Sequence, residues 1–460
     1  MRLSVHESLS KWPLIGYKCP STNLRLKAMK FPGRRNTKHY FPVEDKQRSS
    51  FDGEINRPGN VHVVGIDQLL VDIEIPVNDE FLAQHHFKKG ESFIINDDLA
   101  DAIYWEQKKL GNVIGEFPGG AVGNTLHNFS ILSDSPSVAL GTINKNIEVG
   151  DYAFKYICNT SSKVNLTYLQ PCPRPMGRAL CFVSPDGERT FAISKGCMND
   201  LSPEYLPAEL IKKSAALLVS AYTFRDENAP LAKSTFQAVE IAKAANVPVV
   251  LSLGTSGLVE EKKQMLLEFI PKYVSVVAMN ESEALSLTGI EDPLLAAERV
   301  LDICDMVLLT VGARGLYIGA LTDAEVARPT KEPLHTKSIV EYNKLEYSRA
   351  MMRSECKNPV KVYTHINPFR GGPIKIKNTN GAGDAALAAV LHDLSANLYH
   401  RLKIPNSPKH VAQFLTYSSI SQISKYANRV SFEVLSQNSP RLLRGLPEKE
   451  DGLEEAYWAK

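Results

Sequence analysis

The sequence predicts an α/β protein with a doubly wound, mostly parallel sheet flanked by helices, together with a small β lid. From about residue 61, short apolar runs alternate with longer amphipathic ones, the pattern of strands and crossover helices in a parallel sheet. Two other stretches alternate apolar and polar residues, which indicates a second sheet. Core strands are expected at 61–66, 215–220, 247–251, 274–279 and 306–310, with helices near 234–245 and 281–287.

The bulk composition is that of an ordinary globular protein. Of 460 residues, 43% are hydrophobic and 23% charged, and the formal net charge of +2 provides no overall positive field. We therefore expect no nucleic-acid partner, and the basic segment 30–38 is expected to be a solvated arm. No apolar run is long enough to span a membrane. The seven cysteines are an odd number without CxxC spacing, so reduced thiols and a cytoplasmic location are expected.

The chain is expected to form one large domain with local additions. Residues 1–28 lack the apolar stretch of a secretory signal and are expected to be an unstructured extension, with the domain over 29–460. Lid strands are expected around 70–76 and 179–194, the latter as a hairpin across Ser184–Glu188. The segment 319–377 interrupts the strand–helix rhythm and has a helical pattern near 340–352, so it is interpreted as an insertion.

The most informative motif is a glycine-rich turn that opens a helix. Thr379-Asn380-Gly381-Ala382-Gly383-Asp384 is followed directly by an apolar helical run. The first N–H groups of a helix lack intrahelical partners and the dipole adds positive potential, so such a turn can hold an anion. Asp384 could accept the proton of an alcohol that attacks a nearby phosphorus. The alternative is an ordinary helix start that carries an acidic first turn.

This motif resembles the carboxyl-terminal signature of the ribokinase-like kinase family. The resemblance implies that Asp384 is the catalytic base and that the N–H groups of Gly381, Ala382 and Gly383 form the anion hole. The family has an aspartate where this chain has Asn378, which puts in doubt any role of that position in arranging cations.

Two further elements carry the resemblance on the ATP side. Asn280 and Glu283 follow the 274–279 strand, and in the family such an element arranges Mg²⁺ and phosphates; on its own it is equally a solvated helix start. Thr310, Gly312 and Gly315 form a strand-turn unit that borders the ATP site in relatives. Glu283 is expected to act on the metal indirectly.

The acceptor side is expected in the amino-terminal half, although each motif there also has a purely structural reading. The run from Gly119 to Asn124 resembles a family element in which glycine backbone approaches a sugar and the asparagine binds hydroxyls. Asp72 resembles the ribose-binding aspartate of the adenosine-kinase-like branch, because a carboxylate can accept from two vicinal hydroxyls. The expected substrate-binding residues are Asp67, Gln68, Asp72, Gly119, Gly120, Ala121 and Asn124.

Two arginines complete the candidate site. Arg225 lies just past a core strand, where a guanidinium could read the adjacent acceptors of a 6-oxopurine while Tyr222 or Phe224 stacks on the ring. The alternative is a loop residue paired with Asp226 or Glu227. Arg189, after the hairpin turn, could swing towards the phosphates, or could be an exposed turn residue.

From Met29 onward the chain resembles a purine-nucleoside branch of the family. That resemblance implies transfer of the ATP γ-phosphate to the 5′-hydroxyl of inosine or guanosine, with Mg²⁺, and leaves a monovalent cation such as K⁺ and a homodimer open. The residues alone indicate a phosphoryl transferase that acts on a hydroxyl-bearing molecule. A sugar or adenosine kinase of the same fold and a catalytically silent nucleoside-binding regulator are the alternatives.

Overall fold

The main sheet has nine strands and follows the predicted mostly parallel arrangement. The computed structural model describes residues 60–133, 135–329, 345–373 and 375–446. The predicted extension 1–28 lies outside the described residues. The strand order is β16-β15-β14-β13-β12-β11-β1-β5-β7, with parallel pairing from β14 to β7 and antiparallel pairing at β15 and β16. The strands are β1 (Val63–Ile66), β5 (Ser137–Leu140), β7 (Val164–Asn165), β11 (Leu217–Ser220), β12 (Val249–Ser252), β13 (Val276–Asn280), β14 (Met306–Thr310), β15 (Leu316–Asp323) and β16 (Pro359–Ile366).

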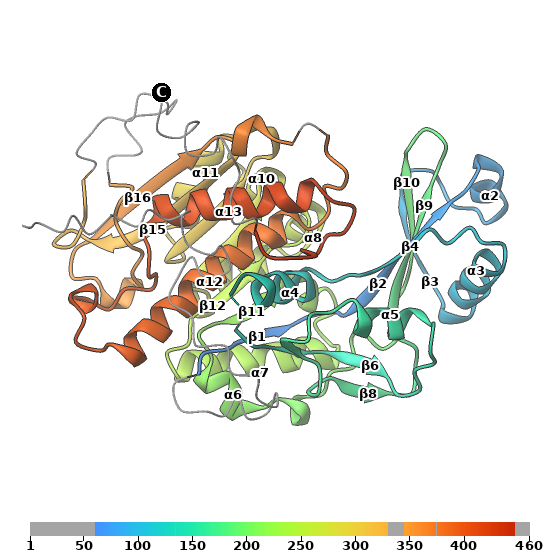
Figure 1. Cartoon of the computed structure of the whole chain (residues 1–460), viewed down its shortest axis with the longest axis horizontal. Coiled ribbons are helices and arrows are strands. Elements are labelled where there is room, and N and C mark those ends of the chain that lie inside the picture. The colour runs from blue at the N-terminus through green and yellow to red at the C-terminus, as the bar shows by residue number, and fades with distance from the viewer. Residues whose placement is uncertain (1–59, 134, 330–344, 374, 447–460) are drawn as a thin grey trace, which may run out of the picture.

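Helices cover both faces of this sheet, so its central strands are buried on both sides. Neighbouring residues on β1 show the division, because Val63 and Val64 enter two different hydrophobic clusters. The first cluster includes α4 (Ala121–Ser133), α12 (Ala382–Lys403) and α13 (Ile420–Leu435), which pack side by side (Figure 1). The second includes α6 (Ala208–Lys213), α7 (Pro230–Ala244), α8 (Ser256–Glu261), α9 (Lys263–Tyr273), α10 (Glu281–Thr288) and α11 (Pro293–Val300).

The predicted second sheet is present and stands away from the main layer (Figure 1). Its five strands are ordered β3-β10-β9-β2-β4, and the antiparallel hairpin of β9 and β10 pairs Arg189 with Val183 beside the turn. We call this sheet and its helices the lid. The elements are β2 (Leu70–Pro76), β3 (Ser92–Ile95), β4 (Gly115–Pro118), β9 (Gly177–Val183), β10 (Arg189–Ser194), α2 (Asp79–Gln84) and α3 (Asp97–Lys109). A separate pair of strands is β6 (Thr142–Asn144) with β8 (Gln170–Cys172), and α5 is Tyr152–Cys158.

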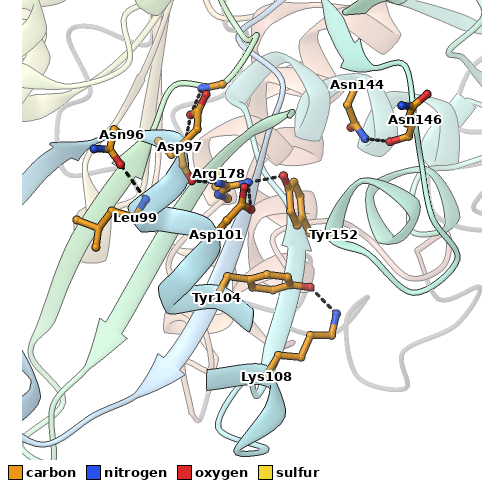
Figure 2. Close-up of polar contacts among 12 residues, drawn as sticks. Asn96, Asp97, Leu99, Asp101, Tyr104, Lys108, Asn144, Asn146, Tyr152 and Arg178 are labelled. Carbon is orange, nitrogen blue, oxygen red and sulfur yellow. Dashed lines mark hydrogen bonds and ion pairs between the residues drawn. The ribbon is translucent and has the colours of Figure 1, made fainter. Parts of the chain in front are cut away.

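A buried arginine ties the lid together (Figure 2). Arg178 on β9 is fully buried, and its guanidinium contacts the Asp101 carboxylate at 2.9 Å on α3. It also donates to the Tyr152 hydroxyl on α5 and, at 2.7 Å, to the Asp97 carbonyl. The Asp97 side chain accepts in turn from Ser194 and from the Gly196 amide. One side chain thus joins a strand and a helix of the lid to a neighbouring helix.

The segment interpreted as an insertion differs from the prediction. Its start, Gly319, lies inside β15, and β16 lies within its second half, so the segment contributes two strands to the main sheet. The predicted helix near 340–352 lies partly outside the described residues; over 345–352 the backbone forms turns and a bridge from Met351 to Phe414 rather than a helix. An added strand pair at the sheet edge explains the broken rhythm, because antiparallel neighbours need no crossover helix.

Six of the seven cysteines lie within the described residues. Within the described residues, the cysteines at 158, 172, 181, 197, 304 and 356 are free thiols, and Cys19 lies outside them. Among the described helices, none combines the length and apolar character needed to cross a bilayer.

Candidate active site

The glycine-rich turn forms the amino-terminal end of α12. Gly381 caps the helix in the left-handed region, with φ of 80°, and a Cβ there would lie 2.5 Å from the Pro440 carbonyl oxygen. Only glycine fits both constraints. At Gly383 a Cβ would meet nothing within 4 Å, so the space before the first turn of the helix is open. The turn therefore presents backbone N–H groups to a space where an anion could bind.

The position that departs from the family signature helps to build this turn. Asn378 donates from Nδ2 to the Asn438 carbonyl at 2.8 Å, and its Oδ1 accepts from the Asn380 amide at 2.9 Å. An ionised aspartate could not make the first bond, because it has no donor.

Asp384 lies in the first turn of α12 and contacts the acceptor side of the site. Its Oδ2 accepts a hydrogen bond from Asn124 Nδ2 on α4 at 3.2 Å. Burial raises the pKa of Asp384 to about 7, although the Asn124 bond acts in the opposite direction. Asp67 and Glu283 also raise this pKa from either side. Asp384 therefore lies within electrostatic range of both the predicted acceptor residues and the predicted ATP-side residues.

Asp67 holds the start of α4 in place. Its Oδ2 accepts from the backbone amides of Val122 at 2.9 Å and Gly123 at 3.3 Å, so it satisfies two of the unpaired N–H groups of that helix. Gly120 has φ of 89°, and a Cβ on it would lie 2.6 Å from Asp67 Oδ2. Burial raises the pKa of Asp67 to about 7. Its contacts are those of a helix cap, and a contact with substrate remains a prediction.

The lid strand β2 brings Asp72 to the same place. A Cβ on Gly119 would lie 2.8 Å from Asp72 Oδ2, so the predicted carboxylate and the predicted glycine turn are neighbours. Burial raises the pKa of Asp72 to about 6. Gln68 lies nearby in sequence, but its amide nitrogen donates to Asn199 at 2.6 Å.

The predicted ATP-side residues form an ordinary helix cap in addition to any binding role. Asn280 accepts from the Glu283 amide at 2.9 Å, and Glu283 accepts from the Asn280 backbone at 3.0 Å and side chain at 2.6 Å. This reciprocal capping box fixes the start of α10. Burial raises the pKa of Glu283 to about 7.

The turn after β14 lies beside this cap. Thr310 pairs with Asn280 across the parallel strands, and the Val311 amide donates to the Gly315 carbonyl at 2.8 Å to close the turn. Gly312 and Gly315 have positive φ, and a Cβ on Gly315 would lie 1.9 Å from the Ile366 carbonyl oxygen. The backbone conformation of this turn therefore favours glycine at both positions, whether or not they border a nucleotide.

The two predicted arginines lie in different surroundings. Arg225 stacks on Tyr222, with 5.1 Å from the guanidinium carbon to the ring centroid, and the Tyr222 hydroxyl is within electrostatic range of Glu283 and Asp384. Glu227, one of the two suggested partners of Arg225, pairs instead with a lysine, Lys262, at 3.0 Å. Arg189 pairs with Glu74 on β2 at 3.1 Å.

One further residue of the site is not among those predicted from the sequence. Arg441 is buried at 2% exposure, and its Nε donates to Asn124 Oδ1 at 2.9 Å. It lies in the segment after α13, in the run Ser439-Pro440-Arg441, and nothing in this run indicates that the arginine reaches the site. Its Nη2 is buried without a hydrogen-bond acceptor among the described residues.

The described residues hold no cluster of three or more histidine, cysteine or acidic side chains suited to a metal ion. Magnesium in kinases takes only one or two carboxylates and completes its shell with phosphate and water oxygens. Glu283 is the acidic side chain of the predicted ATP side, and both of its oxygens accept bonds from Asn280. This donor set fits a metal reached through water better than one ligated directly.

Comparisons with known proteins give the family of the chain. The chain is 51% identical over 433 residues to the guanosine-inosine kinases of Escherichia coli strains K12 and O6:H1, an alignment that covers 94% of this chain and all of each relative. Its fold matches the adenosine kinase of Sinorhizobium meliloti with a TM-score of 0.59 at 21% identity, over 87% of this chain and 100% of that one. A probable sugar kinase of Rhizobium etli gives a TM-score of 0.59 at 21% identity, over 86% and 97% of the two chains. The model of the pfkB family of carbohydrate kinases matches residues 95–335, and the chain belongs to that family.

Proposed function

We propose that this protein transfers the γ-phosphate of ATP to the 5′-hydroxyl of guanosine or inosine. Membership of a kinase family and 51% identity to guanosine-inosine kinases over all of their length support this choice of reaction and acceptor. The observation that carries the mechanism is the place of Asp384, in the first turn of α12 and bonded to Asn124.

In the proposed reaction Asp384 acts as the general base. The 5′-hydroxyl gives its proton to the Asp384 carboxylate while its oxygen bonds to the γ-phosphorus. The bond from that phosphorus to the bridging oxygen breaks, and ADP leaves. A pKa of about 7 suits this task, because the carboxylate is substantially ionised near neutral pH and is still basic enough to accept a proton.

The turn before α12 is proposed to hold the transferring phosphoryl group. The N–H groups of Gly381, Ala382 and Gly383 would stabilise its negative charge, because they are fixed in place before the reaction begins. Mg²⁺ would neutralise phosphate charge when bound, and Asn280 and Glu283 would hold its water ligands. Thr310, Gly312 and Gly315 would border the nucleotide on the neighbouring strand.

The acceptor is proposed to bind between the lid and α4. Asp72 would accept hydrogen bonds from the 2′- and 3′-hydroxyls of the ribose, above the backbone of Gly119 and Gly120. The side chain of Asn124 would lie beside Asp384, the proposed general base. Closure of the lid would exclude water from the site. Arg189 would then leave its ion pair with Glu74 and bind a phosphate group instead.

A reducing compartment and a cation requirement complete the proposal. The free thiols of the described residues suit the cytoplasm. A dependence on K⁺ and assembly as a homodimer are also proposed, and activity in K⁺ against Na⁺ and the mass in solution test them directly.

A direct assay separates this function from its alternatives. Purified protein with ATP and Mg²⁺ should phosphorylate guanosine and inosine with a higher kcat/KM than adenosine or ribose. A preference for adenosine would assign the chain to the activity of its adenosine kinase neighbours, and no transfer to any acceptor would favour a nucleoside-binding regulator. ATP hydrolysis without nucleoside that rivals transfer would argue against lid closure.

A further inference from the structure

Arg441 enters the site on a segment that is fixed to the helix α4. The segment spans residues 437–446, after α13, and its Leu442 amide donates to Asn128 Oδ1 at 2.7 Å. His127 accepts from the Ser161 amide through Nδ1, so its Nε2 carries the hydrogen and donates to the Leu442 carbonyl at 2.9 Å. Gln437 donates to the Arg441 carbonyl at 3.1 Å. The backbone at Arg441 is therefore held against α4, the helix that carries Asn124.

The guanidinium of Arg441 is oriented by three neighbours. Its Nε donates to Asn124 Oδ1 at 2.9 Å, and its Nη1 donates to Thr160 Oγ1 at 2.7 Å. It also lies over the ring of Tyr156, with 5.0 Å from the guanidinium carbon to the centroid. These contacts leave the side chain little freedom to turn.

The direction of these bonds has a chemical consequence for Asn124. An arginine Nε–H can only donate, so the Asn124 atom that faces it must be the carbonyl oxygen. The amide nitrogen then faces Asp384, to which it donates at 3.2 Å. Turned the other way, Asn124 would place its donor against a cation and its carbonyl oxygen against the base.

We propose that Arg441 is a positioning residue, which fixes the Asn124 amide so that it donates to the Asp384 carboxylate. This inference rests on the proposed function, in which Asp384 is the base. Through this bond Arg441 favours the ionised, proton-accepting form of Asp384 without touching the substrate.

The charge of Arg441 acts in the same direction. Burial raises the pKa values of Asp67, Asp72 and Asp384, and Arg441 opposes the rise at each of them. Asp67 and Glu283 both favour the protonated form of Asp384, and the Tyr222 hydroxyl also lies within electrostatic range of it. Arg441 and the Asn124 bond are thus the influences that keep this carboxylate ionised.

A double-mutant cycle tests the relay. Arg441→Met and Asn124→Ala should each lower kcat for guanosine about ten- to hundredfold, the effect of one hydrogen bond to a charged group. The double variant should lose clearly less than the product of the two single losses, because the part of the Arg441 effect that passes through Asn124 is already removed, and only the direct effect of its charge on Asp384 is added. The acid limb of the kcat profile should move to higher pH in both single variants, while KM for ATP stays unchanged.

Several outcomes would overturn the inference. Losses that multiply in the double variant, or a rise in nucleoside KM with kcat and the pH profile unchanged, would make Arg441 a binding or merely structural residue. Arg444→Met, an exposed arginine three residues away, is the matched control and should behave as wild type. Wild-type protein without guanosine or inosine kinase activity would defeat the proposed function itself.

A milder variant covers a failure of Arg441→Met to fold. Thr160→Val removes the acceptor of Nη1 and keeps the side-chain shape, so it loosens the guanidinium without removing it. It should shift the acid limb in the same direction by a smaller amount. A folded Thr160→Val protein with an unchanged profile would count against the relay.

Discussion

Arg178 in the lid and Arg441 in the site are the two largest side chains buried almost completely in the described chain, and their charges are balanced differently. Arg178 touches a carboxylate directly, that of Asp101 at 2.9 Å. Arg441 donates to the neutral groups of Asn124 and Thr160, and the carboxylates that respond to its charge are those of the site.

The difference indicates what each arginine is for. A buried cation without a counterion is costly, and a direct ion pair is the usual way to hold one inside a fold. Arg178 follows that rule and joins structural elements. The positive charge of Arg441 interacts electrostatically with Asp67, Asp72 and Asp384. The stabilisation of this buried charge therefore depends on groups that are predicted to bind substrate or react with it.

The largest expected effect comes from removing the charge of the proposed base. Asp384→Asn should lower kcat by about 10² to 10⁴, the usual contribution of a general base, with nucleoside affinity within a few fold of wild type. In the wild type, kcat/KM should fall as the pH drops below about 7, because the protonated acid cannot accept a proton. Steady-state kinetics between pH 5 and 9 give both quantities; a variant with wild-type kcat would remove Asp384 from this role.

The second prediction concerns Asp72, the lid carboxylate whose pKa the charge of Arg441 lowers. Asp72→Ala should raise KM for guanosine about ten- to hundredfold and leave KM for ATP unchanged, since the loss is that of hydrogen bonds to a charged acceptor. For the same reason 2′-deoxyguanosine should be a poorer substrate of the wild type. Equal kcat/KM for guanosine and 2′-deoxyguanosine would be inconsistent with a ribose contact at Asp72.

Loss of the ion pair between Arg178 and Asp101 in the lid should lower the stability of the protein and leave the rate of phosphoryl transfer unchanged. Asp101→Asn leaves Arg178 without a charged partner and should lower the free energy of unfolding by about 1–3 kcal/mol, with kcat close to wild type. Urea denaturation measures the first and the kinase assay the second. Asp98→Asn, at an exposed position in the first turn of the same helix, is the control. If Asp101→Asn lowered kcat and spared stability, the contrast between the two arginines would fail.

The smallest effect is expected at a third arginine, which is not fully buried. Arg225 lies on the Tyr222 ring, and Tyr222 is within electrostatic range of the ATP-side residue Glu283. Arg225→Ala should reduce the preference for inosine over adenosine by about 1 kcal/mol, the low end for one bidentate contact. An unchanged ratio of the two kcat/KM values would exclude Arg225 from base recognition.

The parts of the fold that were predicted well are those in which a buried strand is also a continuous apolar run. The strand β14 begins and ends as predicted, at Met306 and Thr310, because parallel strands covered on both faces have this pattern. The strand β15 was missed, although it is largely apolar, since it follows the Gly315 turn directly and the predicted insertion began inside it. The four-residue strands β3 and β4 are too short for their alternation to stand out.

The same limit applies to the site. Glycines and an aspartate at a helix start have a signature, so spacing predicts a candidate anion site at Gly381 and Asp384, and the resemblance to a kinase family adds the predicted role of Asp384 as the base. The pairing of Asn124 with Asp384 could not be predicted, because it depends on how α4 and α12 pack. Arg441 has no neighbours in sequence that mark it, and only the packing of its segment against α4 brings it to Asn124.

The packing of the 437–446 segment also determines when, during synthesis and folding, the site can be complete. The bond from Asn124 to Asp384 joins residues 260 apart in sequence, and the bond from Arg441 to Asn124 joins residues 317 apart. Contacts of such high sequence separation form late, because a long loop must close before they contribute any stabilisation. On a ribosome, the first strand and the lid can emerge and fold while Arg441 has yet to be translated. A nascent chain would therefore acquire the ordered base only after nearly all of the sequence has been synthesised.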